Sequence, residues 1–320
     1  MKNEPTPYDI APLASSWARS LRARDLSQNT LRIYAQATSQ LRDFLLTYRP
    51  DGDDSDARPA PTALEGENGI HREHIEIHIT RLRKRTSPGN AHQHFRSLKS
   101  FFNWLVAEEE MDRSPMRTLK APTVPEVEVP VIPDDALKKL LGTCKGKDFE
   151  ARRDAAIIMM FLDTGGRLSE VTVRLQAALD LDINVLHVLG KGNRERPAPF
   201  GRATALAMDR YLRAAAKHLG RPLEPTDPLW FSVKRKEALT IWGVGSMIER
   251  RCAQAGIPHI HPHMFRHTFA HLWKVRGGND DALMRIMGWR SRQMLSHYGK
   301  SAGEARARQQ HRELSPGDHL

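Results

Sequence analysis

The chain has 320 residues, a length that allows two compact domains, each with a core of its own. Its 49 lysines and arginines outnumber 38 acidic residues, and the resulting net charge of +11 and pI of about 9.9 favour a polyanionic partner such as nucleic acid. Two distant cysteines speak against a disulfide framework or thiolate metal site, and no apolar run is long enough for a membrane anchor or secretion signal, so we expect a cytoplasmic protein.

Apolar residues recur at helical spacing through much of the first 120 residues. A stretch that begins at Ser27, behind a Ser/Asn cap region, carries such a stripe in Leu31, Tyr34, Leu41 and Leu45. The periodicity resumes in residues 75–85 and 91–110, where the second stripe consists of Phe95, Leu98, Phe102 and Leu105. The sequence therefore predicts a small helical domain over residues 8–120.

Two stretches have the composition of connections. Residues 51–69 mix Asp, Gly, Pro and Ala without periodicity, and we expect a mobile surface loop there and not an acidic recognition site. Prolines at positions 122, 125, 130 and 133 remove backbone donors and disfavour helix, so residues 121–133 are expected to form an extended linker. This boundary leaves a second domain over residues 134–300 and a tail over residues 301–320 that includes a short helix.

The second domain combines helices with a small hairpin. Residues 134–141 start a capped helix, and the apolar run at 155–162 predicts a buried helix that ends at Gly165 and Gly166 and brings Arg167 to the edge of the core. Residues 179–189 and 196–200 are typical of short strands, and the glycines between them suit a hairpin turn. We therefore predict a mostly α fold with a small antiparallel β-sheet.

The second domain also contains the groups needed to break a phosphodiester without a metal ion. Guanidinium groups match phosphate oxygens and stay charged, and an indole N–H can donate to the same oxygens. A phenol becomes a nucleophile where nearby cations favour its phenolate, and a lysine on a flexible hairpin can protonate the departing oxygen. Each residue alone is most often a surface or packing residue, and only the combination indicates a site. The candidates are Arg167, Lys191, His263, Arg266, Trp289 and Tyr298.

Four separated motifs carry these residues in order. They are T-G-x-R-x-S-E at Thr164–Glu170, G-K-G at Gly190–Gly192, P-H-x-x-R-H at Pro262–His267, and a Gly-Trp pair at Gly288–Trp289 that stands nine residues before Tyr298. On these motifs the chain resembles the tyrosine recombinases of the phage integrase family, from about Ser27 to Tyr298. Three positions depart from the family pattern, namely Ser114, Trp289 and Gly166, and we expect Gly166 to loosen the turn before the first arginine.

The resemblance implies a helical core-binding domain and a mixed α+β catalytic domain that together clamp DNA. It implies that Tyr298 attacks a DNA phosphate to give a 3′-phosphotyrosyl link, that Lys191 protonates the leaving oxygen, and that the other four candidates hold the phosphoryl oxygens. Glu170 would orient these groups or serve only as a first-turn helix carboxylate, and His267 would brace the site. The implied reaction is site-specific DNA recombination without a metal, ATP or another cofactor.

The resemblance also sets expectations for partners. Family members act on double-stranded DNA as homotetramers on two synapsed sites, and an accessory directionality factor is a further candidate partner. The sequence shows no additional arm-binding domain before the helical domain, so we expect an Xer-like or minimal integrase organisation. The tail over residues 301–320 would dock on a neighbouring protomer or remain a frayed basic end.

Three other functions stay open. A type IB topoisomerase uses similar chemistry to relax one duplex, and a catalytically silent DNA-binding regulator would retain the fold without the reaction. A metal site is the third, in a run that holds His259, His261, His263, His267 and His271. The charge of Arg266 within this run opposes a cation, and the run has no glutamate of the kind found in zinc proteases. We therefore interpret the run as the histidine side of an anion site, with His259 and His261 in its lead-in loop.

Overall fold

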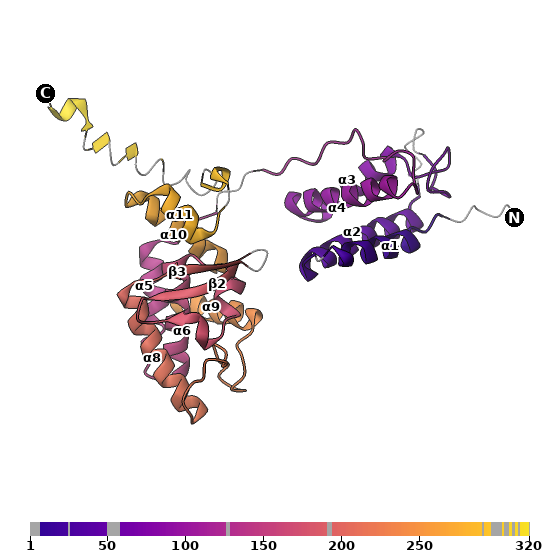
Figure 1. Cartoon of the computed structure of the whole chain (residues 1–320). Helices are drawn as coiled ribbons and strands as arrows, with labels where there is room; N and C mark the ends of the chain where they lie inside the picture. Colours follow the sequence, from indigo (N-terminus) through magenta and orange to yellow (C-terminus); the bar gives the residue numbers. More distant parts are fainter. Residues whose placement is uncertain are drawn as a thin grey trace. The chain divides into compact units, whose positions relative to one another are not determined.

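A computed structural model of the chain describes residues 7–24, 26–49, 58–125, 129–190, 194–289 and 291–295, and parts of 303–319 (Figure 1). The chain divides into two compact units, Met1–Val127 and Glu128–Leu320, each with its own hydrophobic core. Among the described residues, no helix combines the length and the apolar character needed to cross a lipid bilayer.

Helices form the first unit: α1 (Ala11–Ala23), α2 (Gln28–Thr47), α3 (Arg72–Arg85) and α4 (Pro88–Ala107). α2 begins at the predicted cap, because the Ser27 hydroxyl accepts a hydrogen bond from the Thr30 N–H at 3.2 Å. The predicted stripe on α4 is confirmed, since all four of its residues are buried. α1 was not predicted, although it contributes Trp17 and Leu21 to the core between α2 and α4.

Residues 58–69 form a packed turn before α3. The carboxylate of Glu65 accepts a hydrogen bond from the N–H of Asp112 at 2.9 Å, and the carbonyl of Pro59 is hydrogen-bonded to His74 Nε2 at 3.0 Å. The predicted loop is confirmed in that these residues form neither helix nor strand, but the expected mobility is wrong for them, because partners elsewhere in the unit hold them. Residues 51–57, the first part of the same predicted loop, lie outside the described residues.

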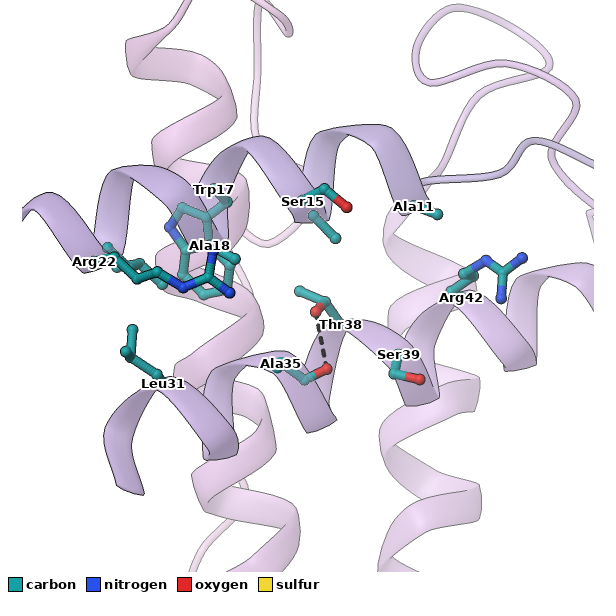
Figure 2. Close-up of a pocket in the computed structure, with 12 residues that line it drawn as sticks. Ala11, Ser15, Trp17, Ala18, Arg22, Leu31, Ala35, Thr38, Ser39 and Arg42 are labelled. Carbon is teal, nitrogen blue, oxygen red and sulfur yellow. Dashed lines mark hydrogen bonds between the residues drawn. The ribbon is translucent and has the colours of Figure 1, made fainter. Parts of the chain in front are cut away.

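A surface pocket of about 290 Å³ lies where α1 and α2 pack together (Figure 2). Ala18 and Ala35 line its middle, with Arg22 and Arg42 at its two ends. The Thr38 hydroxyl donates to the Ala35 carbonyl at 3.1 Å and so turns back onto its own helix. The pocket follows from this local packing, since side chains as short as alanine cannot fill the space between two helices.

The second unit is built around α6 (Phe149–Thr164), which packs against α8 (Arg202–Leu219) and α10 (Pro262–Val275) (Figure 1). The predicted apolar run lies in α6, and most of its side chains are buried. α5 (Asp134–Gly142) packs against α9 (Ile241–Ala255), and α9 also contacts the short α7 (Leu168–Thr172). α11 (Asp280–Met287) packs against α10 and the sheet, and short 3₁₀ turns occur at Gln176–Ala178 and Pro316–His319.

An antiparallel sheet in the order β1-β2-β3 is formed by Leu179–Asp180, Val185–Gly190 and Arg194–Pro199. The predicted pairing of two neighbouring strands is confirmed, with Val188 opposite Arg196. The expectation of one continuous strand over residues 179–189 is wrong, because a turn at 181–184 divides it into β1 and β2. Asn184 adopts the left-handed conformation (φ 54°) that closes this turn.

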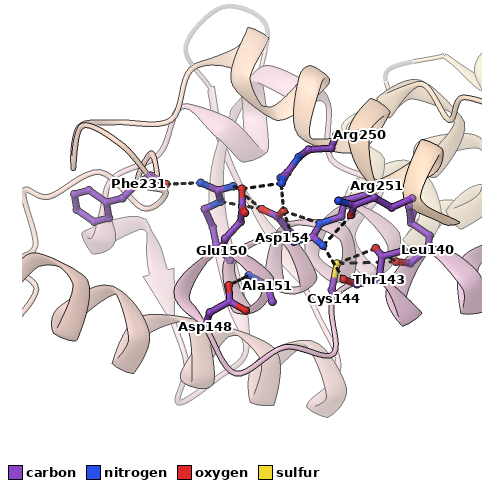
Figure 3. A network of polar contacts seen from close by, with 12 residues as sticks. Leu140, Thr143, Cys144, Asp148, Glu150, Ala151, Asp154, Phe231, Arg250 and Arg251 are labelled. Carbon is purple, nitrogen blue, oxygen red and sulfur yellow. Dashed lines mark hydrogen bonds and ion pairs between the residues drawn. The ribbon is translucent and has the colours of Figure 1, made fainter.

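A buried carboxylate joins helices of the second unit (Figure 3). Asp154 in α6 is fully buried and forms ion pairs with Arg153 at 2.6 Å, Arg250 at 2.9 Å and Arg251 at 2.8 Å. Arg251 also donates to the carbonyl of Thr143, which follows α5. Because a buried charge is tolerated only where it is paired and hydrogen-bonded, this cluster fixes α9 against α6 and the end of α5.

Candidate active site

The turn after α6 requires glycine at its first position. α6 ends at Thr164, and Gly165 adopts a φ of +57°, in the left-handed region that glycine enters without a steric penalty. A Cβ atom at Gly165 would also lie 2.8 Å from Phe269 Cδ1 and 2.9 Å from Met287 Sδ. Backbone conformation and close packing against α10 and α11 therefore both select glycine here.

The second glycine of the turn is also tightly packed. The N–H of Gly166 donates to the hydroxyl of Thr164 at 3.1 Å, and a Cβ atom at Gly166 would lie 2.6 Å from Val171 Cγ2. The expectation that Gly166 loosens the turn is therefore wrong. The next residue, Arg167, leaves the core with 43% of its side chain exposed.

Glu170 receives three hydrogen bonds from two arginines. Its carboxylate accepts from the Arg167 N–H at 2.9 Å, from Arg167 Nη1 at 2.6 Å and from Arg196 Nη2 at 2.8 Å. Burial alone would raise the pKa of this carboxyl, but the Arg167 N–H and the charges of Arg196 and Arg167 outweigh it and lower the pKa. Glu170 is therefore an ionised residue that caps α7 and also binds the guanidinium of Arg167. Both contacts of the sequence prediction are present, and its role in the reaction stays a prediction.

Arg266 connects two parts of the site from within α10. Its side chain is 1% exposed, and it donates from Nη1 to the Gly165 carbonyl at 2.9 Å and from Nη2 to the Met287 carbonyl at 2.7 Å. Its guanidinium carbon lies 5.5 Å from the ring centroid of Trp289. Arg266 therefore holds together the turn of Arg167, the end of α11 and the indole of Trp289.

The end of α11 determines where Trp289 lies. Asn279 caps the helix by accepting from the Ala282 N–H at 2.9 Å, and Gly288 ends it in the left-handed conformation with φ 63°. The chain then bends back at Trp289, whose backbone N–H donates to the Met284 carbonyl at 2.9 Å. Its ring is buried in a small apolar cluster formed by α10, α11 and the residues that follow.

Two of the five histidines lie together on α10. His263 is exposed in the first turn, and its ring centroid is 5.0 Å from that of the buried His267 in an edge-on arrangement. His259 and His261 occupy the predicted lead-in loop and are exposed. Burial lowers the pKa of His271, farther along the helix. Within the described part of the chain, no three His, Cys, Asp or Glu side chains are grouped as ligands of a metal ion.

Lys191 and Tyr298, the predicted acid and nucleophile, lie outside the described residues. The structure nevertheless describes the chain on both sides of Lys191, where β2 ends at Gly190 and β3 starts at Arg194. Residues 291–295 lead from Trp289 toward Tyr298. Of the predicted candidates, the structure thus brings together Arg167, Arg266, Trp289 and Glu170, with His263 and His267 on the helix of Arg266.

Two further residues escaped the sequence analysis. Arg196 binds Glu170 from β3, and strand alternation was a usable signal, because position 196 shares a face with the inward position Ala198. Trp242, in the first turn of α9, is 86% exposed although aromatic residues are usually covered. It closely follows Lys234, Arg235 and Lys236 in the sequence, a pairing of basic and aromatic residues that favours nucleic-acid contact.

The chain is similar to known proteins in sequence. Residues 130–304 match the phage integrase family. The tyrosine recombinase XerD of Listeria innocua is 26% identical over 267 residues, which cover 83% of this chain and 85% of that protein. XerC of Pseudomonas aeruginosa is 31% identical over 194 residues, which cover 59% of this chain and 61% of that relative.

The fold has a close counterpart among solved structures. The crystal structure of a lambda integrase tetramer bound to a Holliday junction superimposes with a TM-score of 0.66 at 16% identity, covering 91% of this chain and 80% of that one. These similarities do not favour the topoisomerase or the silent regulator. The chain belongs to the phage integrase family and is a tyrosine recombinase.

Proposed function

We propose that this chain recombines DNA at specific sites with Tyr298 as nucleophile and Lys191 as general acid. The Tyr298 phenol releases its proton to solvent and its oxygen bonds to a DNA phosphorus, while the 5′ oxygen of the next nucleotide departs with a proton from Lys191. Arg167 and Arg266, with His263 and Trp289, hold the phosphoryl oxygens while negative charge gathers on them. A 5′-hydroxyl of the partner duplex then attacks the phosphotyrosine and releases Tyr298, so the bond energy is retained and ATP is not consumed.

The single observation that carries this proposal is the bond between Arg266 Nη1 and the carbonyl of Gly165, two residues before Arg167. It brings Arg167 and Arg266 to one turn, where the ionised Glu170 fixes the direction of the Arg167 side chain. Paired guanidinium groups suit the doubly charged oxygens of a phosphorane, and burial strengthens the attraction between Arg266 and an anion nearby.

The partners follow from charge and from the relatives. A net charge of +11 supports DNA binding, and lambda integrase has been seen as a tetramer on a Holliday junction. We infer that this chain acts on double-stranded DNA as a homotetramer at two synapsed sites, in the cytoplasm, with a directionality factor as a further partner. Parts of the tail over residues 301–320 lie outside the described residues, and its docking on a neighbouring protomer remains our proposal.

The exposed Trp242 and the basic residues before it add a DNA contact to this proposal. Lys234, Arg235 and Lys236 are all exposed in the loop that leads into α9, and α9 packs against α7, the helix that Arg167 caps. Cations in such a loop contact phosphates and position the protein, whereas an exposed indole offers an apolar surface to bases. We assign this surface to binding of the duplex and not to the chemistry.

Replacement of Tyr298 by phenylalanine tests the function. The DNA that flanks the gene is first searched for inverted repeats, the expected form of a target site. A nicked suicide duplex that contains the target site should trap the wild-type protein as a covalent complex that survives denaturation. Tyr298→Phe should bind this duplex with unchanged affinity and form no adduct, while Tyr34→Phe, in the first unit, should form it normally. An adduct that persists in Tyr298→Phe would rule out the assignment.

Two further measurements separate this function from its rivals. Cleavage should proceed unchanged in EDTA, whereas a metalloenzyme would stop. DNA affinity should fall steeply with salt, because many phosphate contacts release counterions. Relaxation of a plasmid without any recognition site would instead indicate a topoisomerase.

A further inference from the structure

Arg196 is an arginine on the inward face of a strand. In β3 the side chains alternate, and Arg196 shares its face with the buried Ala198 and lies opposite the buried Val188. Only 12% of its side chain is exposed. A buried charge is tolerated only with hydrogen-bonding partners. The partners of Arg196 therefore indicate which part of the protein it supports.

Each recorded partner of Arg196 belongs to an element of the proposed active site. Its Nη2 donates to Glu170 Oε2 at 2.8 Å, and the same carboxylate holds the N–H and the guanidinium of Arg167. Its Nη1 donates to the carbonyl of Ile286 in the last turn of α11. The adjacent carbonyl, that of Met287, is the one that accepts from Arg266.

Gly288 provides the space that Arg196 occupies. A Cβ atom at Gly288 would lie 2.8 Å from Arg196 Nε and 3.0 Å from its Cδ. Gly288 immediately precedes Trp289, and the chain then leads to Tyr298. Arg196 therefore lies against the backbone that leads directly into Trp289.

We propose that Arg196 is a positioning residue for DNA cleavage, joining Glu170, and through it Arg167, to the end of α11. From β3 it ties the sheet to the turn of Arg167 and to the end of α11. In this role it acts without contacting DNA, by fixing where Arg167 and the end of α11 lie. The inference rests on the proposed function, since it concerns the same site.

Arg196→Met removes the donors and keeps much of the apolar side chain. At saturating DNA, we expect its single-turnover rate of covalent complex formation on the suicide duplex to fall about 10- to 100-fold, because small misplacements of reacting groups have effects of this size. DNA affinity should stay within about twofold of wild type, since no DNA contact is lost. Arg213→Met, at an exposed ion pair on α8, is the matched control and should keep the wild-type rate.

A second variant and a double-mutant cycle distinguish a positioning role from an effect on folding alone. Arg196→Lys retains the charge but not the fork that reaches Glu170 and Ile286 together, so its rate should lie between those of wild type and the methionine variant. In a Glu170→Gln background, Arg196→Met should slow cleavage by a smaller factor than in wild type, because the two residues act as a unit. Thermal unfolding of each variant shows whether it folds.

The outcomes distinguish the inference from the function on which it rests. A wild-type protein without any adduct contradicts the proposed function. An active wild type combined with an unchanged rate in Arg196→Met, or with fully additive effects in the cycle, contradicts the positioning role. If the methionine variant does not fold, a lysine variant with the full wild-type rate contradicts it as well.

Discussion

The guanidinium of Arg266 and the carbonyl of Gly165 are joined by a hydrogen bond of 2.9 Å, although the two residues are 101 positions apart. This bond fixes α10 to the turn that presents Arg167, and a second bond from Arg266 to Met287 fixes the end of α11. Three motifs that are far apart in the sequence therefore meet at one buried side chain.

Arg266→Lys tests this junction. Lysine keeps the charge but lacks the planar fork, so it cannot serve the carbonyls of Gly165 and Met287 together. We expect the single-turnover cleavage rate to fall about 100-fold or more, as when one preorganised donor is removed from an active site. Arg276→Lys, at the exposed end of the same helix, is the matched control. A lysine variant at position 266 that cleaves as fast as wild type contradicts this account.

Trp242→Ala tests the DNA surface outside the chemistry. Because the indole is 86% exposed, its removal should leave thermal stability unchanged. The dissociation constant for the target duplex should rise about tenfold, as expected for loss of one aromatic anchor. Ile183→Ala removes another exposed apolar side chain and should leave DNA affinity as it is. Equal affinities of the Trp242 variant and the wild type would remove this surface from the proposal.

Asp154→Asn tests the buried ion cluster of Figure 3. The change removes the counter-charge of the buried Arg251 and leaves the buried Arg153 with only the more distant Glu150, at 3.7 Å. Breaking a buried pair in this way lowers the free energy of unfolding by about 3–5 kcal/mol. Asp209→Asn breaks the exposed pair with Arg213 and should cost about 1 kcal/mol or less. Urea unfolding measures the free energy of unfolding of both variants. Similar decreases in the two variants would contradict a stabilising role of the buried cluster.

His78 makes the first unit sensitive to acid. Burial, and then the neighbouring His94, lowers the pKa of His78 from 6.5 to about 4. As the pH falls from 6.5 toward 4, the unfolded chain takes up a proton that the folded chain refuses. The free energy of unfolding therefore decreases as the pH falls through this window, by at most about 1.4 kcal/mol per pH unit.

His78→Leu should make the free energy of unfolding less dependent on pH between 4 and 6.5. Some dependence will remain, because burial also lowers the pKa of His74 and of His94. His259→Leu, in an exposed loop, is the control and should retain the full dependence. Urea unfolding at a series of pH values measures the slope, and an unchanged slope in His78→Leu contradicts the prediction.

Much of the helical framework could be predicted because its signals are local. The cap at Ser27, the stripe on α4 and the end of α6 at Gly165 each depend on residues within one or two turns of one another. The break between β1 and β2 was missed because Asn184 in a left-handed conformation interrupts a run that is otherwise typical of a strand. The packed turn at residues 58–69 was missed because its partners, such as the N–H of Asp112, lie far along the chain.

The sequence by itself determined which charged groups, hydrogen-bond donors and phenol are available to the proposed site, because residue types and motif spacing can be read directly from it. Only the tertiary structure decided which of these groups are held together and by what. Arg196 reaches Glu170 and Ile286 through contacts that span 26 and 90 positions, and no local pattern encodes such pairings. They arise because a charge buried in the folding core must find hydrogen-bonding partners there, wherever these lie in the chain.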